Sequence, residues 1–378
     1  MRPLSGLKVV ELARILAGPW IGQVLADLGA DVIKVESPEG DDTRKWGPPF
    51  IEAGSDRSAA YFHACNRGKR SVVADFSTED GRDLVRRLAL GADVLIENFK
   101  VGSLRKYGLD HATLGAANPR LVYCSVTGFG QDGPRAGEAG YDFMIQGLAG
   151  IMDLTGEPER EPQKIGVAFA DIFTGLYGVI AIQAALIERA RSGRGAHVDM
   201  ALMDCMTGVL ANQAMNYLAS GVPPRRLGNA HPNIAPYQTL PVADGFFIIA
   251  VGNDRQFASF CDVIGLPALP LDERFASNAL RVRNREILSG LLAERTQGWR
   301  RDELLAALAR VFVPAGPINS VADALADPQI IHRAMRIAPG GIPGLRTPVT
   351  IDGEPAASAM RAPGLGEHTA AIRAEIGM

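Results

Sequence analysis

The sequence has few cysteines and no pattern that would pair them. Four occur in 378 residues, at Cys65, Cys124, Cys205 and Cys261, and none belongs to a C-x-x-C motif. We therefore expect reduced thiols in a cytoplasmic protein and no cysteine metal cage. The six histidines are not arranged at metal-ligand spacings either, so we expect no bound metal.

The chain also lacks an excess of positive charge. It has 39 Lys and Arg against 42 Asp and Glu, a net charge of −3 and a pI of about 6.1. This balance disfavours binding to nucleic acid or to an anionic membrane surface. A polyanionic ligand would therefore need a local basic cluster. The run of Arg67, Lys69 and Arg70 is by itself typical of a solvated face.

The main uncharged apolar run, Ile172–Ile187, is shorter than the roughly 20 residues that a membrane-spanning helix needs. We expect it to form a buried helix of a large soluble core, ended by cations and then Gly193. Gly175 and Gly178 weaken such a helix by roughly 1 kcal/mol each. Their presence indicates that another element or a ligand approaches closely. Residues 1–7 lack the apolar core of a signal peptide, so we expect no export.

The first half of the chain alternates between short apolar segments and helical patterns. Strands are predicted at Leu7–Leu12, Asp31–Glu36, Ser71–Phe76, Asp93–Glu97 and Arg120–Val126. A short helix is predicted at Gly22–Leu28. This alternation is typical of a doubly wound α/β fold with a parallel sheet. The link Ala17–Gly22 is not G-x-G-x-x-G, so the sequence does not support a nicotinamide site.

We expect two domains, and the fold class α/β. Residues 1–200 would form a large Rossmann-like domain with a mostly parallel sheet, and residues 201–224 a linker helix. Residues 225–320 would form a smaller α+β domain, in which Tyr237–Val242 and Phe246–Val251 make a hairpin. Residues 321–378 would be a linker and a C-terminal return to the large domain.

No Ser-His-Asp, H-E-x-x-H or P-loop pattern occurs, which disfavours hydrolase and phosphoryl-transfer chemistry. One carboxylate, Asp171, stands at the start of the apolar run. It can be a helix N-cap, or a catalytic carboxylate at a helix N-terminus, where the dipole favours negative charge. The two roles are compatible. His231 lies in a loop that could face a cleft or serve a structural role.

Eight motifs in a fixed order carry a resemblance to a known family. They are L-A-G-P, G-A-D-V-I-K-V-E, G-D-D-T-R-K-W-G-P-P-F, N-R-G-K-R-S, A-D-V-L-I-E-N-F, Y-D-F-M-I-Q-G-L-A-G, A-D-I-F-T-G and G-L-G-E-H-T. Together they span essentially the whole chain. The sequence resembles the family III CoA-transferases, which include formyl-CoA, carnitine-CoA and succinyl-CoA:dicarboxylate transferases and a 2-methylacyl-CoA racemase branch.

The resemblance implies that Asp171, in A-D-I-F-T-G, is the nucleophile. It would attack an acyl-CoA, form a mixed anhydride and then an aspartyl-CoA thioester, and pass CoA to a carboxylic acid. CoA would be a substrate, with no tightly bound cofactor. The family's CoA contacts fall on Leu16, Ala17, Ser37, Ala74, Asp75, Phe76, Ser77, Asn98, Phe99, Lys100, Lys106, Ala139, Gly140, Tyr141 and Asp142. An intertwined homodimer is also implied.

Several residues differ from those of other family members, and these differences narrow the range of expected substrates. Leu16 replaces the glutamine of oxalate-using members, and Ser37 and Ser77 occupy positions that are basic there. Formyl-CoA:oxalate transfer is therefore not expected. The G-D-D-T-R-K-W-G-P-P-F segment is most similar to the succinyl-CoA-dependent dicarboxylate branch, which makes succinyl-CoA a candidate donor.

Two other functions remain open. A racemase of the same family needs a histidine where this chain has Tyr141, and a phenol titrates near 10 against about 6.5 for imidazole. A CoA-binding protein without turnover would need Asp171 to act only as a cap.

Overall fold

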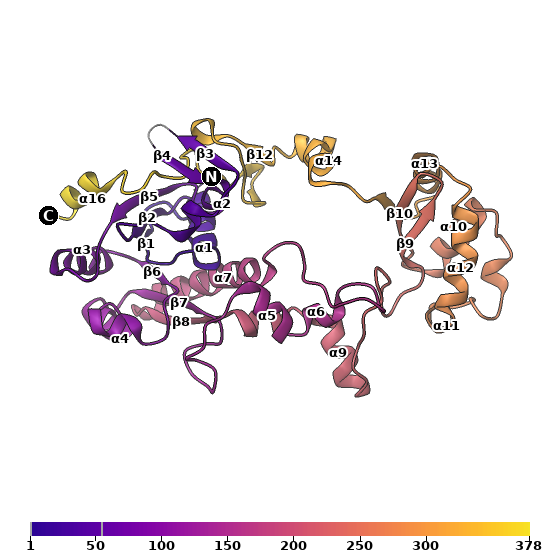
Figure 1. Cartoon of the computed structure of the whole chain (residues 1–378), viewed down its shortest axis with the longest axis horizontal. Helices are drawn as coiled ribbons and strands as arrows, with labels where there is room; N and C mark the ends of the chain where they lie inside the picture. The colour runs from indigo at the N-terminus through magenta and orange to yellow at the C-terminus, as the bar shows by residue number, and fades with distance from the viewer. Residues whose placement is uncertain (1, 54–55) are drawn as a thin grey trace. The chain divides into compact units, whose positions relative to one another are not determined.

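The computed structural model describes residues 2–53 and 56–378, which form two compact units (Figure 1). The larger unit comprises the chain up to Ile151 together with residues 165–210 and 328–378. The smaller unit comprises residues 152–164 and 211–327. Each unit has its own buried core.

A six-stranded parallel sheet lies at the centre of the larger unit. Its strands are β1 (Lys8–Glu11), β2 (Asp31–Glu36), β5 (Lys69–Val73), β6 (Val94–Glu97), β7 (Val122–Thr127) and β8 (Ala196–Ala201). Their order is β5-β2-β1-β6-β7-β8, and every neighbouring pair is parallel. The order changes direction between β1 and β6. In sheets of this kind, ligands bind outside the carboxyl ends of the strands at that switch point.

The sheet confirms the expected parallel architecture and adds one strand to it. No strand of this sheet was predicted after Arg120–Val126, but residues 196–201 form β8 at the edge of the sheet. Side chains alternate between exposed and partly covered along its first half, so the segment does not show the continuous apolar run of a central parallel strand.

Helices connect the strands of the larger unit. They are α1 (Ala17–Asp27), α2 (Ala60–Cys65), α3 (Glu79–Leu90), α4 (His111–Ala117), α5 (Asp142–Leu148), α7 (Phe169–Ser192), α8 (Leu202–Gly208), α15 (Pro328–His332) and α16 (Thr369–Glu375). Short 3-10 turns occur at Asp42–Lys45, Ser103–Tyr107 and Pro339–Gly341. Small antiparallel pairs are β3 (Phe50–Ala53) with β4 (Asp56–Ala59), β12 (Arg336–Ile337) with β13 (Gly344–Leu345), and β14 (Thr350–Ile351) with β15 (Glu354–Pro355).

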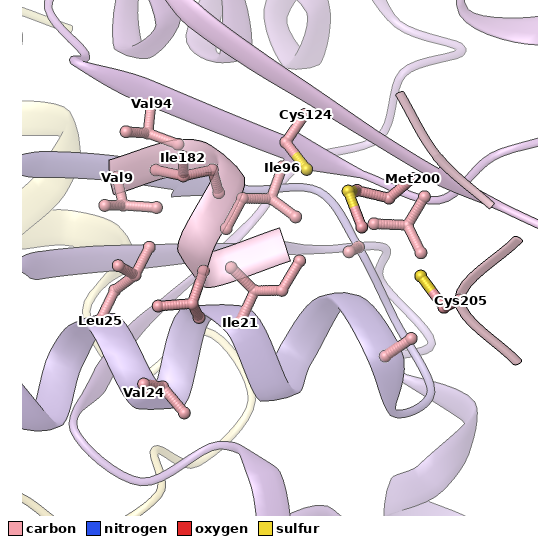
Figure 2. Close-up of a cluster of buried hydrophobic side chains, with 14 of the residues drawn as sticks. Val9, Ile21, Val24, Leu25, Val94, Ile96, Cys124, Ile182, Met200 and Cys205 are labelled. Atoms are coloured by element: carbon pink, nitrogen blue, oxygen red, sulfur yellow. The ribbon is translucent and has the colours of Figure 1, made fainter. Parts of the chain in front are cut away.

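Helices α1 and α7 pack together against one face of the sheet (Figure 2). A Cβ added at Gly175 would lie 3.1 Å from the Ala17 carbonyl oxygen, and one at Gly178 would lie 2.5 Å from the Ile21 side chain. The close approach predicted at these glycines is confirmed, and the approaching element is α1. The other face of the sheet carries a second core, to which α3 contributes.

Helix α7 runs for 24 residues, beyond the uncharged run, and ends at Gly193 with φ +73°. By length and composition alone it could cross a membrane. One face is buried, at residues such as Thr174 and Ile182, while Leu176, Tyr177, Ile180 and Ile187 are exposed. The predicted burial of this helix in the core therefore holds for one face only in the single chain.

The smaller unit contains a three-stranded antiparallel sheet in the order β11-β10-β9. The predicted hairpin is present as β9 (Tyr237–Val242) and β10 (Gly245–Ala250), with β11 (Ala315–Pro317) beside β10. Its helices are α9 (Ala211–Ser220), α10 (Asp254–Val263), α11 (Asn278–Arg283), α12 (Arg285–Thr296), α13 (Arg301–Arg310) and α14 (Val321–Ala326), and a 3-10 turn covers Leu269–Leu271. Helix α6 (Ile151–Leu154) lies where the chain passes between the units.

The division between the units differs from the expected one. The predicted linker helix over 201–224 is two helices, α8 and α9, separated near Ala211, whose φ is +46°. Leu202, Cys205 and Met206 of α8 are buried in the core of the larger unit. That apolar face explains why the larger unit extends to Leu210.

Candidate functional site

A cavity of about 300 Å³ lies at the carboxyl ends of β1, β6 and β7, next to the switch point of the sheet. Its walls come from residues 14–17 after β1, 98–101 after β6, 126–128 at the end of β7 and the loop 136–141. Asp171 and Leu202 complete the lining. We call this space the first cavity.

A second cavity of about 300 Å³ lies beyond the carboxyl ends of β2 and β5. It is lined by residues 12–14, 34–41 and 74–77, together with Phe99 and Tyr107. Arg14 and Phe99 line both cavities, so the two adjoin. An extended ligand can therefore occupy both.

The structure places most of the predicted site residues in these two cavities. The first is lined by Leu16, Ala17, Asn98, Phe99, Lys100, Ala139, Gly140, Tyr141 and Asp171. The second is lined by Ser37, Ala74, Asp75, Phe76, Ser77 and, again, Phe99. Lys106 and Asp142 are not among the lining residues of either. The Lys106 ammonium lies 4.7 Å from the ring centre of Tyr107, which lines the second cavity.

Asp171 is not the N-cap of α7. The N-cap position belongs to Ala168, which makes no side-chain capping bond, and Asp171 lies in the first turn. Asp142 takes the capping role instead, because its Oδ1 accepts a hydrogen bond from the Ala170 N–H at 2.8 Å. Its Oδ2 accepts one from Gln146 Nε2, also at 2.8 Å. Of the two roles considered for Asp171, the structure does not support the cap, and its carboxylate is left for another role.

Burial raises the pKa of Asp171 to about 7, and the nearby charge of Asp142 acts in the same direction. Near neutral pH the ionised and protonated forms are then comparably populated. A carboxylate perturbed by desolvation and a charged neighbour at a cavity wall is a strong candidate for a functional group.

Two residues of this site were missed in the sequence. Arg14 lines both cavities, and its position two residues after the predicted strand Leu7–Leu12 could have indicated it. The second residue is Tyr61. Burial raises the pKa of its phenol to about 12, and the charge of Asp171 acts in the same direction. Its ring packs edge-on against Trp46, with 5.3 Å between ring centres. No signal in the sequence identified Tyr61.

The basic run at residues 67–70 is not a solvated face. Lys69 is fully buried and Arg67 nearly so. The Lys69 ammonium lies 2.8 Å from Glu11 Oε2, and the Arg67 guanidinium pairs with Asp27. Because these cations are paired inside the unit, they are not available to bind a polyanion. The cations on the first cavity wall are Arg14 and Lys100.

His231 belongs to the smaller unit. Its Nδ1 accepts a hydrogen bond from the Asn233 N–H at 3.1 Å, and its ring packs against Tyr237. Among residues 2–53 and 56–378, no three His, Cys, Asp or Glu side chains are grouped so that they could hold a metal ion.

Comparisons with known proteins show the family to which the chain is similar. The sequence model of CoA-transferase family III matches residues 4–369. The succinate–glutarate CoA-transferase of Agrobacterium fabrum is 57% identical over 382 residues, which cover 99% of this chain and 96% of that protein. The succinyl-CoA:glutarate CoA-transferase of Homo sapiens is 38% identical over 336 residues, covering 89% and 76%. A crystal structure of a CAIB/BAIF family protein from Brucella suis shares 70% identity with a TM-score of 0.90, covering 99% of both chains.

Proposed function

The chain belongs to the family III CoA-transferases, and we propose that it transfers CoA between carboxylic acids through covalent intermediates on Asp171. The observation that carries this proposal is a half-buried carboxylate with a pKa of about 7 in a cavity at the switch point of a parallel sheet. Carboxylates act as nucleophiles toward activated acyl groups when they are positioned and poorly solvated.

The proposed reaction begins when an Asp171 oxygen attacks the thioester carbonyl of the donor. The carbon–sulfur bond breaks, CoA leaves as a thiolate, and a mixed anhydride forms. The thiolate then attacks the Asp171 carbonyl, which releases the donor acid as a carboxylate and leaves an aspartyl-CoA thioester. An acceptor carboxylate reverses the two steps, so that one thioester is exchanged for another without water or a redox change.

The surroundings of Asp171 suit this role. Only the ionised form can attack, and a carboxylate whose pKa is near 7 is more basic than an ordinary one yet still substantially ionised at neutral pH. Asp142 fixes the start of α7 through the Ala170 N–H, which holds the backbone next to the nucleophile. Exclusion of water from the cavity would protect an anhydride from hydrolysis.

The two adjoining cavities suit a long acyl-CoA by their size and position. We place the thioester in the first cavity, beside Asp171, and the nucleotide end in the second, which is lined by Ser37 and residues 74–77. Arg14, which lines both cavities and pairs with the exposed Asp42 at 3.1 Å, and Lys100, which lines the first, supply positive charge there. Local charge of this kind is what a chain with a net charge of −3 needs to bind a polyanion.

The substrates are proposed to be dicarboxylic acids, with succinyl-CoA as the donor. This assignment rests on the names of the two relatives described above, both of which refer to succinate or succinyl-CoA and to glutarate. The G-D-D-T-R-K-W-G-P-P-F segment at residues 40–50 points to the same branch.

The acceptor can be tested with matched acids. Purified protein with succinyl-CoA should convert glutarate to glutaryl-CoA much faster than it converts pentanoate, a monoacid with the same number of carbons. Glutarate should exceed pentanoate in kcat/KM by at least about 100-fold, because a site that pairs the second carboxylate leaves that partner unsatisfied with a monoacid. Equal rates with both acids would refute the dicarboxylate assignment but not the transfer chemistry.

We further propose that a second copy of the chain covers the exposed apolar side chains of α5 and α7, as an intertwined homodimer would. These side chains are Phe143, Met144, Leu148, Leu176, Tyr177, Ile180 and Ile187. Apolar surface of this kind marks an interaction site on a protein. Light scattering should give a dimer mass for the wild type and for L271E, which alters an exposed leucine elsewhere, but a smaller mass for I180E. A monomeric wild type would refute this assembly.

A further inference from the structure

Ile15 has a backbone conformation that β-branched residues rarely adopt. Its φ is +73°, in the left-handed region, where a branched side chain is a genuine outlier. The residue lies between β1 and α1, and Arg14, Ile15, Leu16 and Ala17 together form one wall of the first cavity. Conformations of this kind persist only where the surroundings hold them, and they are concentrated at functional sites.

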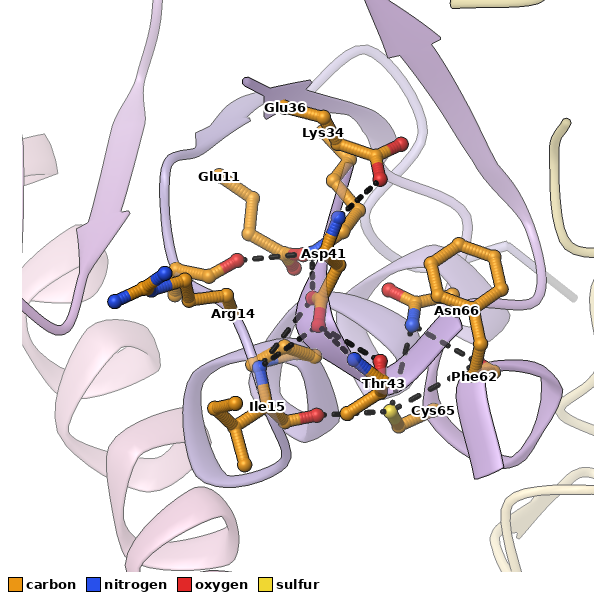
Figure 3. Close-up of polar contacts among 12 residues, drawn as sticks. Glu11, Arg14, Ile15, Lys34, Glu36, Asp41, Thr43, Phe62, Cys65 and Asn66 are labelled. Carbon is orange, nitrogen blue, oxygen red and sulfur yellow. Dashed lines mark hydrogen bonds and ion pairs between the residues drawn. The ribbon is translucent and has the colours of Figure 1, made fainter. Parts of the chain in front are cut away.

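The Asp41 carboxylate holds Ile15 directly (Figure 3). Both carboxylate oxygens accept a hydrogen bond from the Ile15 N–H at 3.3 Å. The Cys65 thiol donates to the Ile15 carbonyl oxygen at 3.5 Å. On the other side, the Asn98 side chain accepts from the Arg14 N–H at 3.0 Å and donates to the Arg14 carbonyl oxygen at 2.6 Å. The backbone of this cavity wall is therefore held by hydrogen bonds at two successive residues, Arg14 and Ile15.

Asp41 is itself fixed by buried charges. The Lys34 ammonium lies 2.9 Å from Asp41 Oδ2 and 3.2 Å from Glu11 Oε1. Lys69 pairs with the same glutamate. All four side chains are at most 2% exposed. Thr43 adds two hydrogen bonds to Asp41, from its N–H at 3.0 Å and its hydroxyl at 2.7 Å.

A buried ion network is weak evidence for stability, because desolvation of the charges offsets their attraction. Burial alone would raise the pKa of Asp41, but the charge of Lys34 and the Thr43 hydrogen bonds bring it below its usual value. Asp41 thus stays an anion and a full hydrogen-bond acceptor. Asp41 also accepts hydrogen bonds from the Ile15 N–H in the wall of the first cavity. This contact gives the ion network a role other than stability.

We propose that Asp41 is a positioning residue for CoA transfer, which keeps Ile15 in the left-handed conformation and thereby fixes the cavity wall at residues 14–17. The inference rests on the proposed function of Asp171. In this account the wall sets where the thioester carbonyl lies relative to the Asp171 carboxylate. A misplacement of about 1 Å at such a site is enough to slow a reaction by about 100-fold.

A double-mutant cycle between Asp41 and Ile15 tests the proposal. Glycine adopts positive φ without strain. In the I15G variant, residue 15 should therefore keep its left-handed conformation with much less help from Asp41. We expect D41N to lower kcat/KM for succinyl-CoA at least about tenfold in the wild-type background, mainly through kcat. In the I15G background the same substitution should lower it by less than about threefold. An equal loss in both backgrounds would show that Asp41 does not act through Ile15, and would overturn the proposal.

A matched control separates positioning from the general loss of a buried charge. Asp27 is also a buried carboxylate of the larger unit, paired with Arg67 and hydrogen-bonded to the Thr347 hydroxyl at 2.7 Å, and it lines neither cavity. D27N should lower the melting temperature while leaving kcat/KM within about twofold. If D27N lowers kcat/KM as much as D41N does, the proposal fails.

If D41N does not fold, T43V can replace it in the double-mutant cycle with I15G. T43V is the milder change, because it removes only the hydroxyl that donates to Asp41. A loss of kcat/KM that I15G reduces would support the proposal, and a loss that I15G leaves unchanged would overturn it. A wild-type protein that transfers no CoA would instead refute the proposed function. Normal transfer by both the wild type and D41N would refute only the role of Asp41.

Discussion

Asp171→Asn should make the protein more stable at and above neutral pH, although it removes the proposed nucleophile. Folding raises the pKa of this carboxyl from 3.8 to about 7. The folded state therefore favours the protonated form, and ionising Asp171 costs folding free energy. At 1.36 kcal/mol per pH unit the cost reaches at most about 4 kcal/mol. Because the side chain is only half-buried and partly screened by water, we expect about 2 kcal/mol.

The pH dependence has a definite sign. Below the unfolded pKa, Asp171 is protonated in both states and contributes no penalty. The penalty grows as the pH rises from about 4 to 7 and is complete above the folded pKa. The amide of D171N is neutral throughout. Urea unfolding of both proteins at equal concentration should therefore show little difference near pH 4 and a gain for the variant that reaches its plateau near pH 8.

Asp142 provides the paired control. It accepts hydrogen bonds from the Ala170 N–H and from Gln146, so D142A removes a helix cap. It should lower stability by about 1 kcal/mol, the opposite sign to D171N. If D171N is no more stable than the wild type at pH 8, and the difference does not change with pH, the desolvated state of Asp171 is refuted.

Three further predictions concern the site. D142N should shift the rise of kcat/KM with pH to lower pH by less than one unit, because it removes the charge of Asp142 while burial, the main cause of the raised pKa of Asp171, remains. A pH profile of kcat/KM that does not shift would show that Asp142 does not affect the pKa of Asp171. K106E should weaken the apparent affinity for succinyl-CoA, and a change of less than about twofold, under 0.5 kcal/mol, would mark Lys106 as a surface lysine. G128A should lower kcat/KM at least about tenfold, since its Cβ would lie 2.6 Å from the Gly140 Cα across the cavity wall; unchanged kinetics would mean that this wall can move.

The parallel sheet could be predicted from the sequence because short apolar segments such as residues 94–96 alternate with helical patterns. The segments that became β1, β2, β5, β6 and β7 all lie within or overlap predicted strands. The start of α1 was placed five residues too late, since Ala17–Gly22 contains two glycines and a proline. Proline is tolerated in the first turn of a helix, where its missing N–H is not needed.

The chemical environment of the site was harder to predict from the sequence than the sheet. The motif around Asp171 pointed to a carboxylate that lines the first cavity, but not to its environment, because the start of α7 is capped by Asp142, 28 residues before Ala170. The buried state of Lys69 was unpredictable from a basic run, since its partner Glu11 is 58 residues away in another strand. The left-handed conformation of Ile15 has no local signature at all, because glycine is the residue that usually marks it.

Trapping the intermediate tests the central claim most directly. Wild-type protein incubated with succinyl-CoA alone, then treated with hydroxylamine and digested, should yield a hydroxamate on the peptide that contains Asp171. Hydroxylamine attacks thioesters and anhydrides but not free carboxylates, so D171N should yield none. Transfer at catalytic rates without this adduct would contradict the account. So would rapid entry of solvent deuterium at the α-carbon of a branched acyl-CoA with Asp171 unmodified, because that is the signature of a racemase.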